Sequence, residues 1–358
     1  MIILAFESSC DETSVAVVKR EDTGFAVLSN IVASQIETHR LYGGVVPEIA
    51  SRAHIEVISK ITYEALDGAG VTLSDIELVS VTANPGLIGA LLVGVNYAKA
   101  VAFANGIPLV GVDHIKGHIA AAYLGSDDCA PKPPFLALAA SGGHTAIYRV
   151  DSYTDYTLIG TTRDDAIGES YDKIGRMIGI PYPAGRGFDE LSREGFALAT
   201  RDTENFYKKY KKSEAYGLYT LPSPALHDGS LDFSFSGLKT AAINLLNTAK
   251  MKGEEINRPL FAARYTYEAT EAVVRQLRAA LLQHPECDLV VAGGVGANSH
   301  IRREALALTA ELGRGLFIPP ICYCGDNAAM IAAQGYYDYM AGVCHDSSLN
   351  ASALDSIV

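Results

Sequence analysis

The strongest chemical signal in the sequence is a pair of histidines, His114 and His118, in the segment His-Ile-Lys-Gly-His. Residues four apart lie on one face of a helix, so both imidazoles can bind one divalent ion if a third ligand comes from elsewhere. Asp326 is the candidate third ligand, because it directly precedes a helix that we predict to begin near Asn327. Two histidines and one carboxylate with open positions suit Fe(II) or Zn(II), and the spacing does not choose between them. The alternative is a pair of structural histidines on one helical turn.

Metalloproteases with an H-E-x-x-H motif share this histidine spacing. Their mechanism needs a glutamate directly after the first histidine as general base, and here that position is Ile115. The pair therefore indicates a metal without indicating proteolysis.

Three turns of small residues follow predicted strands, at residues 8–11, 141–143 and 293–296, and we call them the first, second and third turns. Glycine lets a backbone approach a ligand closely, and exposed N–H groups at such places attract phosphate oxygens. None of the turns matches the P-loop, and the third lacks the spacing of a dinucleotide site. Together they favour a nucleotide bound between two lobes, and the alternative is that the glycines serve tight turns only.

Three polar residues near these turns have a structural explanation as well as a functional one. Asn298, just past the third turn, caps a helix or contacts a ribose or phosphate. Asp172 and Glu169 each stand four residues before a basic residue, so both can form ion pairs along an exposed helix face. The pattern leaves both explanations open.

The elements that must position these residues alternate between strands and helices, which predicts an α/β fold. One unit occurs twice: a strand at 3–6 returns through 13–18, and a strand at 136–140 returns through 145–150. Two such hairpins about 130 residues apart predict two related lobes.

Further elements follow from apolar spacing. We predict a helix with its apolar face at Ile55, Ile58, Ile61 and Ala65. Others are a strand at 78–82, helices near 86–105 and 327–341, a helix with apolar positions 167, 171, 174 and 178, and a strand at 288–292.

The prolines at 131, 133 and 134 are the best linker candidate. The predicted division is an N-terminal lobe at 1–132, a C-terminal lobe at 133–325 and a terminal helix and tail at 326–358, with that helix packing back on the first lobe. The length of 358 residues agrees with about two domains.

Composition limits the possible partners. The net charge is −12, from 29 basic and 41 acidic residues, so a nucleic acid must meet a local basic patch. The one dense basic stretch, residues 206–212, alternates aromatics with lysines in a way that suits phosphate and base contacts, and the alternative is a solvated lysine-rich loop.

The same composition favours the cytoplasm. The six cysteines show no disulfide framework, and the apolar N-terminus lacks the basic start of a signal peptide. Residues 78–98 are uncharged, but Asn84-Pro85-Gly86 interrupts them, so we expect no membrane span.

With these pieces side by side, the chain resembles the TsaD family of bacterial tRNA threonylcarbamoyltransferases. The matching segments follow the family's order along nearly the whole chain and are Glu7–Thr13, Tyr42–Glu48, Pro85–Leu91, His114–His118, Ser141–Thr145, Tyr171–Lys173, Phe235–Thr240, Gly293–Val295 with Ala297–Asn298, and Asp326–Asn327.

This resemblance implies a two-lobed fold of the actin, sugar-kinase and Hsp70 (ASKHA) class, with duplicated lobes around a nucleotide cleft. It also implies transfer of threonylcarbamoyl from threonylcarbamoyl-AMP to N6 of the adenosine 3′ of the anticodon, in tRNAs that read codons beginning with adenine, with release of AMP. The implied partners are a TsaB-like paralogue and a small TsaE-like ATPase.

The resemblance also assigns roles to individual residues. It implies one divalent ion per subunit, Fe(II) before Zn(II), on His114, His118 and Asp326, and catalytically sensitive carboxylates at Asp11 and Glu12. The residues that it implies for adenylate binding are Ala139, Ala140, Ser141, Gly142, Gly143, Asp172, Gly185, Asp189 and Asn298.

The sequence departs from the family pattern at a few places. Ala184-Gly185-Arg186 replaces a frequent Gly-Gly-Pro, Asn84 replaces a usual glycine, and Ala139 stands where some archaeal relatives have a tyrosine metal ligand. The rival functions are a phosphotransferase or ATPase of the same fold and a non-catalytic scaffold, which has no need of a metal site.

Overall fold

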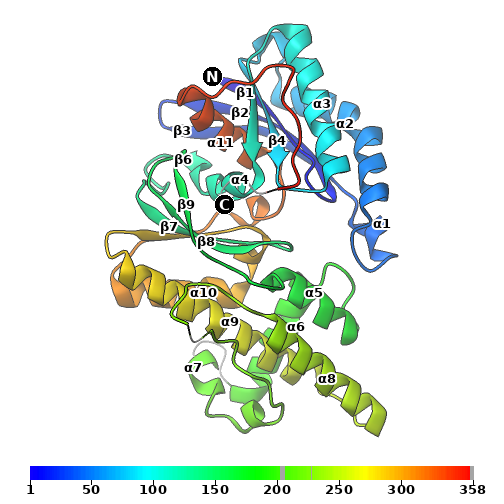
Figure 1. Ribbon diagram of the computed structural model, residues 1–358, viewed down its shortest axis with the longest axis vertical. Helices are drawn as coiled ribbons and strands as arrows, with labels where there is room; N and C mark the ends of the chain where they lie inside the picture. The colour runs from blue at the N-terminus through cyan, green and yellow to red at the C-terminus, as the bar shows by residue number, and fades with distance from the viewer. Residues whose placement is uncertain (202–205, 227, 355–358) are drawn as a thin grey trace.

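Two β-sheets, one in each half of the molecule, form the framework of the chain (Figure 1). The computed structural model describes residues 1–201, 206–226 and 228–354. The strands of the first sheet are β1 (Ile2–Glu7), β2 (Glu12–Glu21), β3 (Gly24–Ser34), β4 (Leu78–Asn84), β5 (Leu109–Asp113) and the short β6 (Gly125–Ser126). Those of the second are β7 (Phe135–Ala140), β8 (Thr145–Val150), β9 (Tyr156–Thr161), β10 (Asp288–Ala292) and β11 (Leu316–Phe317).

The two sheets share one topology. The first has the order β5-β4-β1-β2-β3-β6, and the second has the order β11-β10-β7-β8-β9. In each, the central hairpin is antiparallel, its first strand pairs in parallel with the next strand outward, and that strand pairs in parallel with the edge strand. The predicted duplication and the α/β, two-lobed fold class are therefore confirmed.

The helices of the first half are α1 (Ile36–Arg40), α2 (Pro47–Ala69), α3 (Ile88–Asn105) and α4 (His114–Ala120), with short 3₁₀ turns η1 (Leu73–Asp75) and η2 (Ala121–Tyr123). Later come α5 (Ile167–Met177), α6 (Gly185–Thr200), α7 (Phe206–Tyr210), η3 (Glu214–Gly217), α8 (Ser236–Lys252), α9 (Arg258–Gln283), η4 (Gly294–Ala297), α10 (Ser299–Leu312), η5 (Ile321–Tyr323) and α11 (Ala328–Met340).

Side-chain alternation along the strands separates the core into layers. In β1, Leu4 and Phe6 pack with α2 and α3, whereas Ile3 and Ala5 pack with α4 and α11 on the opposite face. In β7, the side chains at 135, 137 and 139 pack in that same α4 and α11 cluster, and those at 136, 138 and 140 pack with α5, α8 and α9.

Helices α4 and α11 consequently lie between the two sheets (Figure 1). Residues 328–333 of α11 are fully buried there. The candidate metal ligands on α4 are held by the packing of both halves. The exact division of the chain at 132/133 and 325/326 stays a prediction.

The structure corrects one predicted core position. Ile55 of α2 is 64% exposed, whereas Ile58, Ile61 and Ala65 are buried as expected. The uncharged segment 78–98 divides into β4 and α3, as the Asn-Pro-Gly break predicts. Within the described residues α3 is the one helix long and apolar enough to cross a membrane, and its face at Ala90, Gly94 and Ala98 is buried in the first half of the molecule.

Candidate functional site

Helix α4, which carries both histidines, begins at a tightly held cap. Asp113 Oδ1 accepts hydrogen bonds from the backbone N–H groups of Ile115 (2.8 Å) and Lys116 (3.2 Å). Asn84 at the end of β4 donates to Asp113 Oδ2 at 2.7 Å. The cap fixes the first turn of the helix, and so it fixes the backbone of His114.

The three predicted metal ligands come together at this place. One ligand atom each from His114, His118 and Asp326 lies within 4.8 Å of the others. Asp326 Oδ1 is 3.7 Å from His114 Nε2 and 3.2 Å from His118 Nε2. His118 is 1% exposed; its Nε2 faces Asp326, and within the described residues its Nδ1 makes no hydrogen bond.

This donor set suits a divalent cation. A buried imidazole without a hydrogen-bond partner is costly unless something else occupies its lone pair. Two imidazole nitrogens and one carboxylate oxygen leave coordination positions open for a substrate atom or water. The residues therefore fit the ion that the family resemblance implies.

Charge around His114 favours its protonated form while no cation is bound. Burial works to lower its pKa, but the carboxylates of Glu7 and Asp326 outweigh burial and raise it to about 9. Burial works to raise the pKa of Asp326, but the neighbouring imidazoles hold it below its usual range. A bound cation must displace a proton here, because only a neutral imidazole can be a ligand.

The first turn adds two more carboxyl groups beside this cluster. Asp11 is 7% exposed, and Tyr182 from the second half of the molecule donates a long hydrogen bond of 3.4 Å to its Oδ2. Burial raises the pKa of Glu12 to about 9, with repulsion from Asp326 and Asp11 adding to it. Glu12 therefore carries a proton at neutral pH and can donate a hydrogen bond.

The second turn presents backbone instead of charge. Ala139 and Ala140 are buried at the end of β7, and at Gly142 and Gly143 the position that a Cβ atom would take has open space around it to 4 Å. Gly293 of the third turn packs directly on Ala140, where a side chain would collide with the Ala140 carbonyl. The second and third turns are therefore neighbours, as a shared phosphate site requires.

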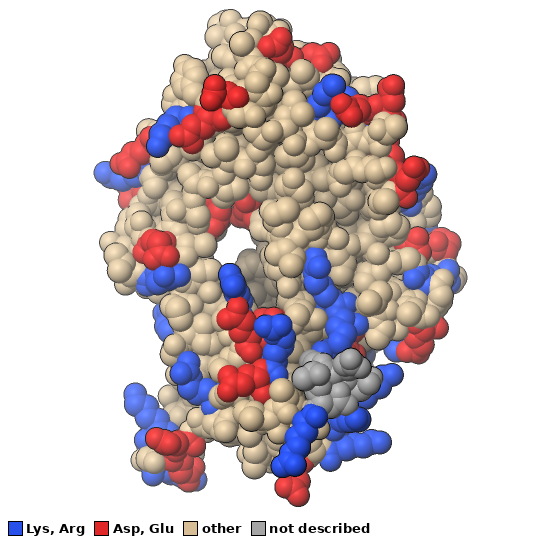
Figure 2. Space-filling view, turned by 180° about the vertical axis from the view of Figure 1, so that it is seen from behind, with Lys and Arg blue, Asp and Glu red and all other residues tan. Residues whose placement is uncertain are grey.

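His144, at the end of the second turn, connects it electrostatically to the metal ligands. Burial lowers its pKa to about 4, and the positive imidazoles of His114 and His118 contribute. His144 is therefore neutral at physiological pH. Figure 2 shows the molecule hollowed between its halves with acidic side chains on the inner rim. A single molecule that contacts both the second turn and the candidate metal ligands stays a prediction.

Asp172 and Gly185 lie together where α5 meets α6. Asp172 Oδ1 accepts a hydrogen bond from the Ala184 backbone at 2.7 Å, one residue before Gly185. Among the described residues Asp172 forms no ion pair with Arg176, so the structural alternative does not hold for Asp172. It holds for Glu169, which pairs with Lys173 at 2.6 Å. Burial raises the pKa of Asp172.

Asp189 and Asn298 meet at the start of α10. Asp189 Oδ1 accepts from the backbone and hydroxyl of Ser299, both at 2.9 Å. Asn298 caps α10 by accepting from the N–H groups of His300 and Ile301, which confirms its predicted capping role. A contact of either residue with a ligand stays a prediction.

Two residues of this region were missed as site residues by sequence reasoning. Glu7 accepts hydrogen bonds beside His114, and Tyr182 contacts Asp11 across the two halves. Glu7 lies in a segment that matches the family, which was the available signal. No local pattern marks Tyr182.

The basic stretch is only partly as predicted. Lys208, Lys209, Lys211 and Lys212 are exposed. Tyr207 and Tyr210 are buried, and Tyr207 stacks on Tyr267 with ring centroids 4.8 Å apart. The prediction that these two tyrosines contact bases is therefore wrong, because their rings belong to the protein core.

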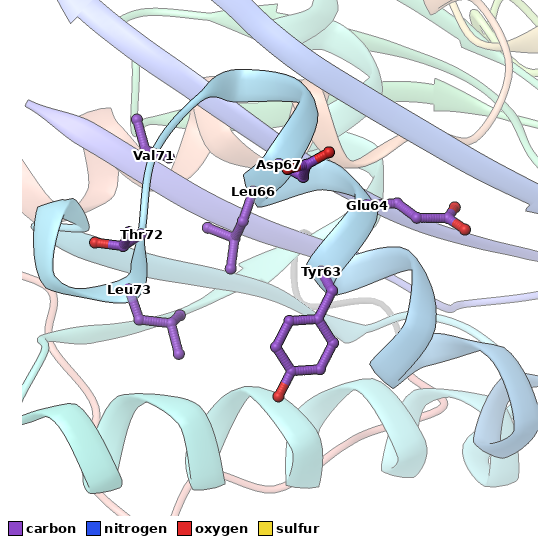
Figure 3. Close-up of a pocket in the computed structure, with 7 residues that line it drawn as sticks. All are labelled: Tyr63, Glu64, Leu66, Asp67, Val71, Thr72 and Leu73. Atoms are coloured by element: carbon purple, nitrogen blue, oxygen red, sulfur yellow. The ribbon is translucent and has the colours of Figure 1, made fainter.

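A surface depression of about 630 Å³ lies away from all of these residues. It is lined by Tyr63, Glu64, Leu66, Asp67, Val71, Thr72 and Leu73, at the end of α2 and the loop that follows (Figure 3). It contains none of the predicted site residues.

Comparisons with known proteins show which family the chain is similar to. The profile of the TsaD family, described as tRNA N6-adenosine threonylcarbamoyltransferase, matches residues 26–333. Proteins of that name from Clostridium botulinum strain 657 and Geobacillus thermodenitrificans are each 47% identical over 98% of this chain, covering 96% and 95% of their own lengths. Full-length HypF in its phosphate- and nucleotide-bound form shares the fold, with a TM-score of 0.50 and 14% identity, over 99% of this chain and 47% of HypF.

Proposed function

The chain belongs to the TsaD family, the tRNA N6-adenosine threonylcarbamoyltransferases, and we propose that it takes threonylcarbamoyl from threonylcarbamoyl-AMP in the cleft between its two hairpin turns. The acceptor is N6 of the adenosine 3′ of the anticodon. The observation that carries the proposal is the cluster of buried His114 and His118 with half-buried Asp326, beside one acidic turn and one open glycine turn.

The reaction forms a bond between N6 and the carbamoyl carbon and breaks the bond from that carbon to the AMP phosphate. The adenine amine is a weak nucleophile, so positioning must supply much of the rate. Asp11 accepts the proton that N6 loses. Glu12, which holds its own proton at neutral pH, donates a hydrogen bond to the reacting group or its leaving phosphate.

His114, His118 and Asp326 would hold one divalent cation, Fe(II) or Zn(II). When bound, the cation stabilises negative charge on the carbonyl or the threonyl carboxylate. The test of the donor set is metal analysis of protein purified without added metal and without oxygen.

The AMP part of the donor would lie on the second and third turns. Backbone N–H groups at Gly142 and Gly143 can reach phosphate oxygens because the space where a side chain would stand is open at both glycines. The Ser141 N–H donates to the His144 carbonyl at 2.8 Å, so Ser141 supports the shape of the turn and its backbone N–H is not one of these donors. Asp172, Gly185, Asp189 and Asn298 complete the proposed adenylate site, with Ala139 and Ala140 as its buried floor.

The tRNA backbone would meet the four exposed lysines at 208, 209, 211 and 212. Figure 2 shows basic side chains gathered at the lower end of the molecule, in the half that contains α7. Because the chain has a net charge of −12, these lysines offer a local positive field on a surface that is acidic overall.

The lysine proposal has a charge-matched test. Replacing Lys208 and Lys211 by alanine should weaken tRNA binding and make it less dependent on salt, because fewer counterions are released. The control is the double alanine variant of Lys250 and Lys252, two exposed lysines on α8. If both double variants weaken tRNA binding equally, the loss reflects the change in net charge and the stretch at 206–212 has no specific role.

A TsaB-like paralogue and a TsaE-like ATPase would complete the active assembly in the cytoplasm. The outer faces of α2 and α3 expose large apolar side chains, among them Tyr63 (69%) and Phe103 (85%). Exposed apolar surface of this kind is typical of protein interfaces, and we propose that the paralogue covers it. Phe103→Asp should prevent copurification of the paralogue while leaving adenylate binding unchanged.

The test of the proposed function is nucleoside mass analysis of unmodified tRNA after incubation with this protein, its candidate partners and threonylcarbamoyl-AMP, with and without chelator. We expect threonylcarbamoyladenosine that chelation abolishes. Product that survives complete metal removal would contradict the metal-dependent mechanism. Phosphorylation of a small hydroxylated acceptor by ATP, or no product despite bound adenylate, would favour the phosphotransferase or scaffold functions.

A further inference from the structure

Glu7 is a buried carboxylate that the proposed reaction does not use. Its side chain has no exposed surface, and it stands at the end of β1, where the first turn begins. Burying an ionised carboxylate is costly unless its oxygens accept enough hydrogen bonds. The partners of Glu7 therefore indicate what the residue is for.

All the groups around Glu7 can donate to it. Oε1 accepts from the Ser9 backbone N–H. Oε2 accepts from the Thr82 hydroxyl at 2.6 Å and lies 3.0 Å from His114 Nδ1. The Ser9 hydroxyl is also 3.2 Å from that ring nitrogen.

The other nitrogen of the same ring points to the candidate metal centre. His114 Nε2 faces Asp326 Oδ1 at 3.7 Å, and Nδ1 faces Glu7. A hydrogen bond from Nδ1–H to a carboxylate leaves the Nε2 lone pair free for a cation and fixes the plane of the ring. His118 has no such anchor among the described residues, since its Nδ1 is buried without a hydrogen bond.

We propose that Glu7 is the positioning residue of the metal centre: it holds His114 as the Nδ1–H tautomer, so that Nε2 is the ligand atom. The inference rests on the proposed metal site of His114, His118 and Asp326. Glu7 itself does not touch the cation or the substrate. It connects β1, β4 through Thr82 and α4 through His114, so the ligand geometry is set by the sheet beneath it.

Glu7→Gln tests this directly because a carboxamide cannot accept from every neighbour. The Ser9 N–H can only donate, so the carbonyl of the new carboxamide must face it, and the amide NH₂ then faces Thr82 and His114. The Thr82 hydroxyl can rotate to accept. His114 Nδ1 can accept only after losing its proton, which moves the proton to Nε2 and removes the ligand lone pair.

We expect Glu7→Gln to weaken Zn(II) binding 10- to 100-fold, the usual effect of losing such a partner, measured by calorimetric titration of the full chain at pH 9, where competition from the His114 proton, which Glu7 strengthens, is small. Glu48→Gln, the same change at an exposed site on α2, should leave the affinity within about threefold of the parent chain. Thr82→Val removes another partner of Glu7 and leaves its bond to His114, so it should cost less than Glu7→Gln. Unchanged zinc affinity in folded Glu7→Gln would overturn the inference while leaving the metal site and the proposed function in place.

A second readout uses the unaltered chain and stands even if Glu7→Gln fails to fold. Ring ¹⁵N–¹H correlations of the zinc-loaded protein should show His114 with a slowly exchanging Nδ1–H and a zinc-bound Nε2. Zinc bound through Nδ1 of His114 would overturn the inference and leave the metal site and the proposed function in place. Failure of the parent chain to bind zinc or iron at all would overturn both the inference and the proposed metal site.

Discussion

The two hairpin turns occupy equivalent places in equivalent sheets, yet they differ in what they present to the cleft. The first turn lies between β1 and β2, and the second lies between β7 and β8. Three carboxyl groups stand in or beside the first turn: Glu7 and Asp11 are buried, and Glu12 is half-buried. The second offers Gly142 and Gly143 with open space around them.

This difference indicates how one duplicated scaffold can serve a two-part substrate. Carboxyl groups and imidazoles can bind a cation and move a proton, whereas bare backbone N–H groups can hold a phosphate without doing chemistry on it. We therefore assign the reacting carbamoyl group to the side of the first turn and the AMP group to the side of the second. A change that affects metal binding at the first turn should therefore leave AMP binding at the second turn unaltered, and the reverse should also hold.

The largest effect is expected from Asp326→Ala. Losing one of three protein ligands from the candidate centre should abolish bound metal and reduce transfer to background, because two imidazoles alone do not complete the donor set. Metal content and transfer are measured together, with exposed Asp22→Ala as the matched control. AMP binding should remain. Loss of AMP binding would show that the metal site and the AMP site depend on each other.

The next effect concerns the first turn itself. Asp11→Asn keeps the shape of the side chain and removes its ability to accept a proton, so single-turnover transfer should fall about 10²- to 10⁴-fold. Zinc affinity and adenylate affinity should change little. Transfer at the parental rate would exclude Asp11 as the base.

Metal binding should depend on pH in a way that AMP binding does not. Burial lowers the pKa of His114, but Glu7 and Asp326 raise it to about 9. Below that pH a proton therefore competes with the cation for His114. Zinc affinity should therefore rise with pH from 7 to 9, by up to about 100-fold for one displaced proton, and then level off. Calorimetric titrations at several pH values measure this.

AMP affinity of the chelated protein is the control for that series. The phosphate of AMP is fully ionised above pH 7, and His144 is neutral there because burial and the nearby imidazoles lower its pKa to about 4. AMP binding should not rise from pH 7 to 9, and it should fall if Glu12, whose pKa burial raises to about 9, donates its proton to the AMP phosphate. If the affinities for zinc and for AMP rise together with pH, the two turns do not bind separate parts of the substrate.

The smallest effect is expected from Gly142→Val. The structure has room for the added side chain, so the fold should tolerate it, but the chain would then occupy the space proposed for the phosphate. AMP affinity should fall about tenfold, or about 1.4 kcal/mol, with unchanged zinc affinity. Gly217→Val, at another exposed glycine with open surroundings, is the control; equal AMP affinities in all three chains would remove the second turn from the site.

Much of this architecture is predictable from sequence because it depends on local patterns. The paired hairpins, the helix that carries His114 and His118, and the capping role of Asn298 follow from alternation, spacing and residue type within short windows. Matching of segments along the whole chain then brings Asp326 to the histidines, although 208 residues separate it from His118.

The remainder depends on contacts that no local pattern encodes. Glu7 meets His114 across 107 residues, and Tyr182 meets Asp11 across 171. The lysine-rich stretch has the composition of a nucleic-acid site, but Tyr207 is buried in the hydrophobic cluster that contains Phe196 and Tyr267. Tertiary packing decides such cases, because an aromatic ring gains more from burial than from solvent exposure.

The most direct test of the central claim, that one molecule bridges the two turns, is ³¹P relaxation of AMP bound to protein loaded with Mn(II) as a paramagnetic probe. We expect strong Mn(II)-dependent broadening of the AMP phosphorus signal in the parent chain and its disappearance in Asp326→Ala, with AMP still bound in both. Equal broadening in the two proteins, or none in either, would contradict a shared site.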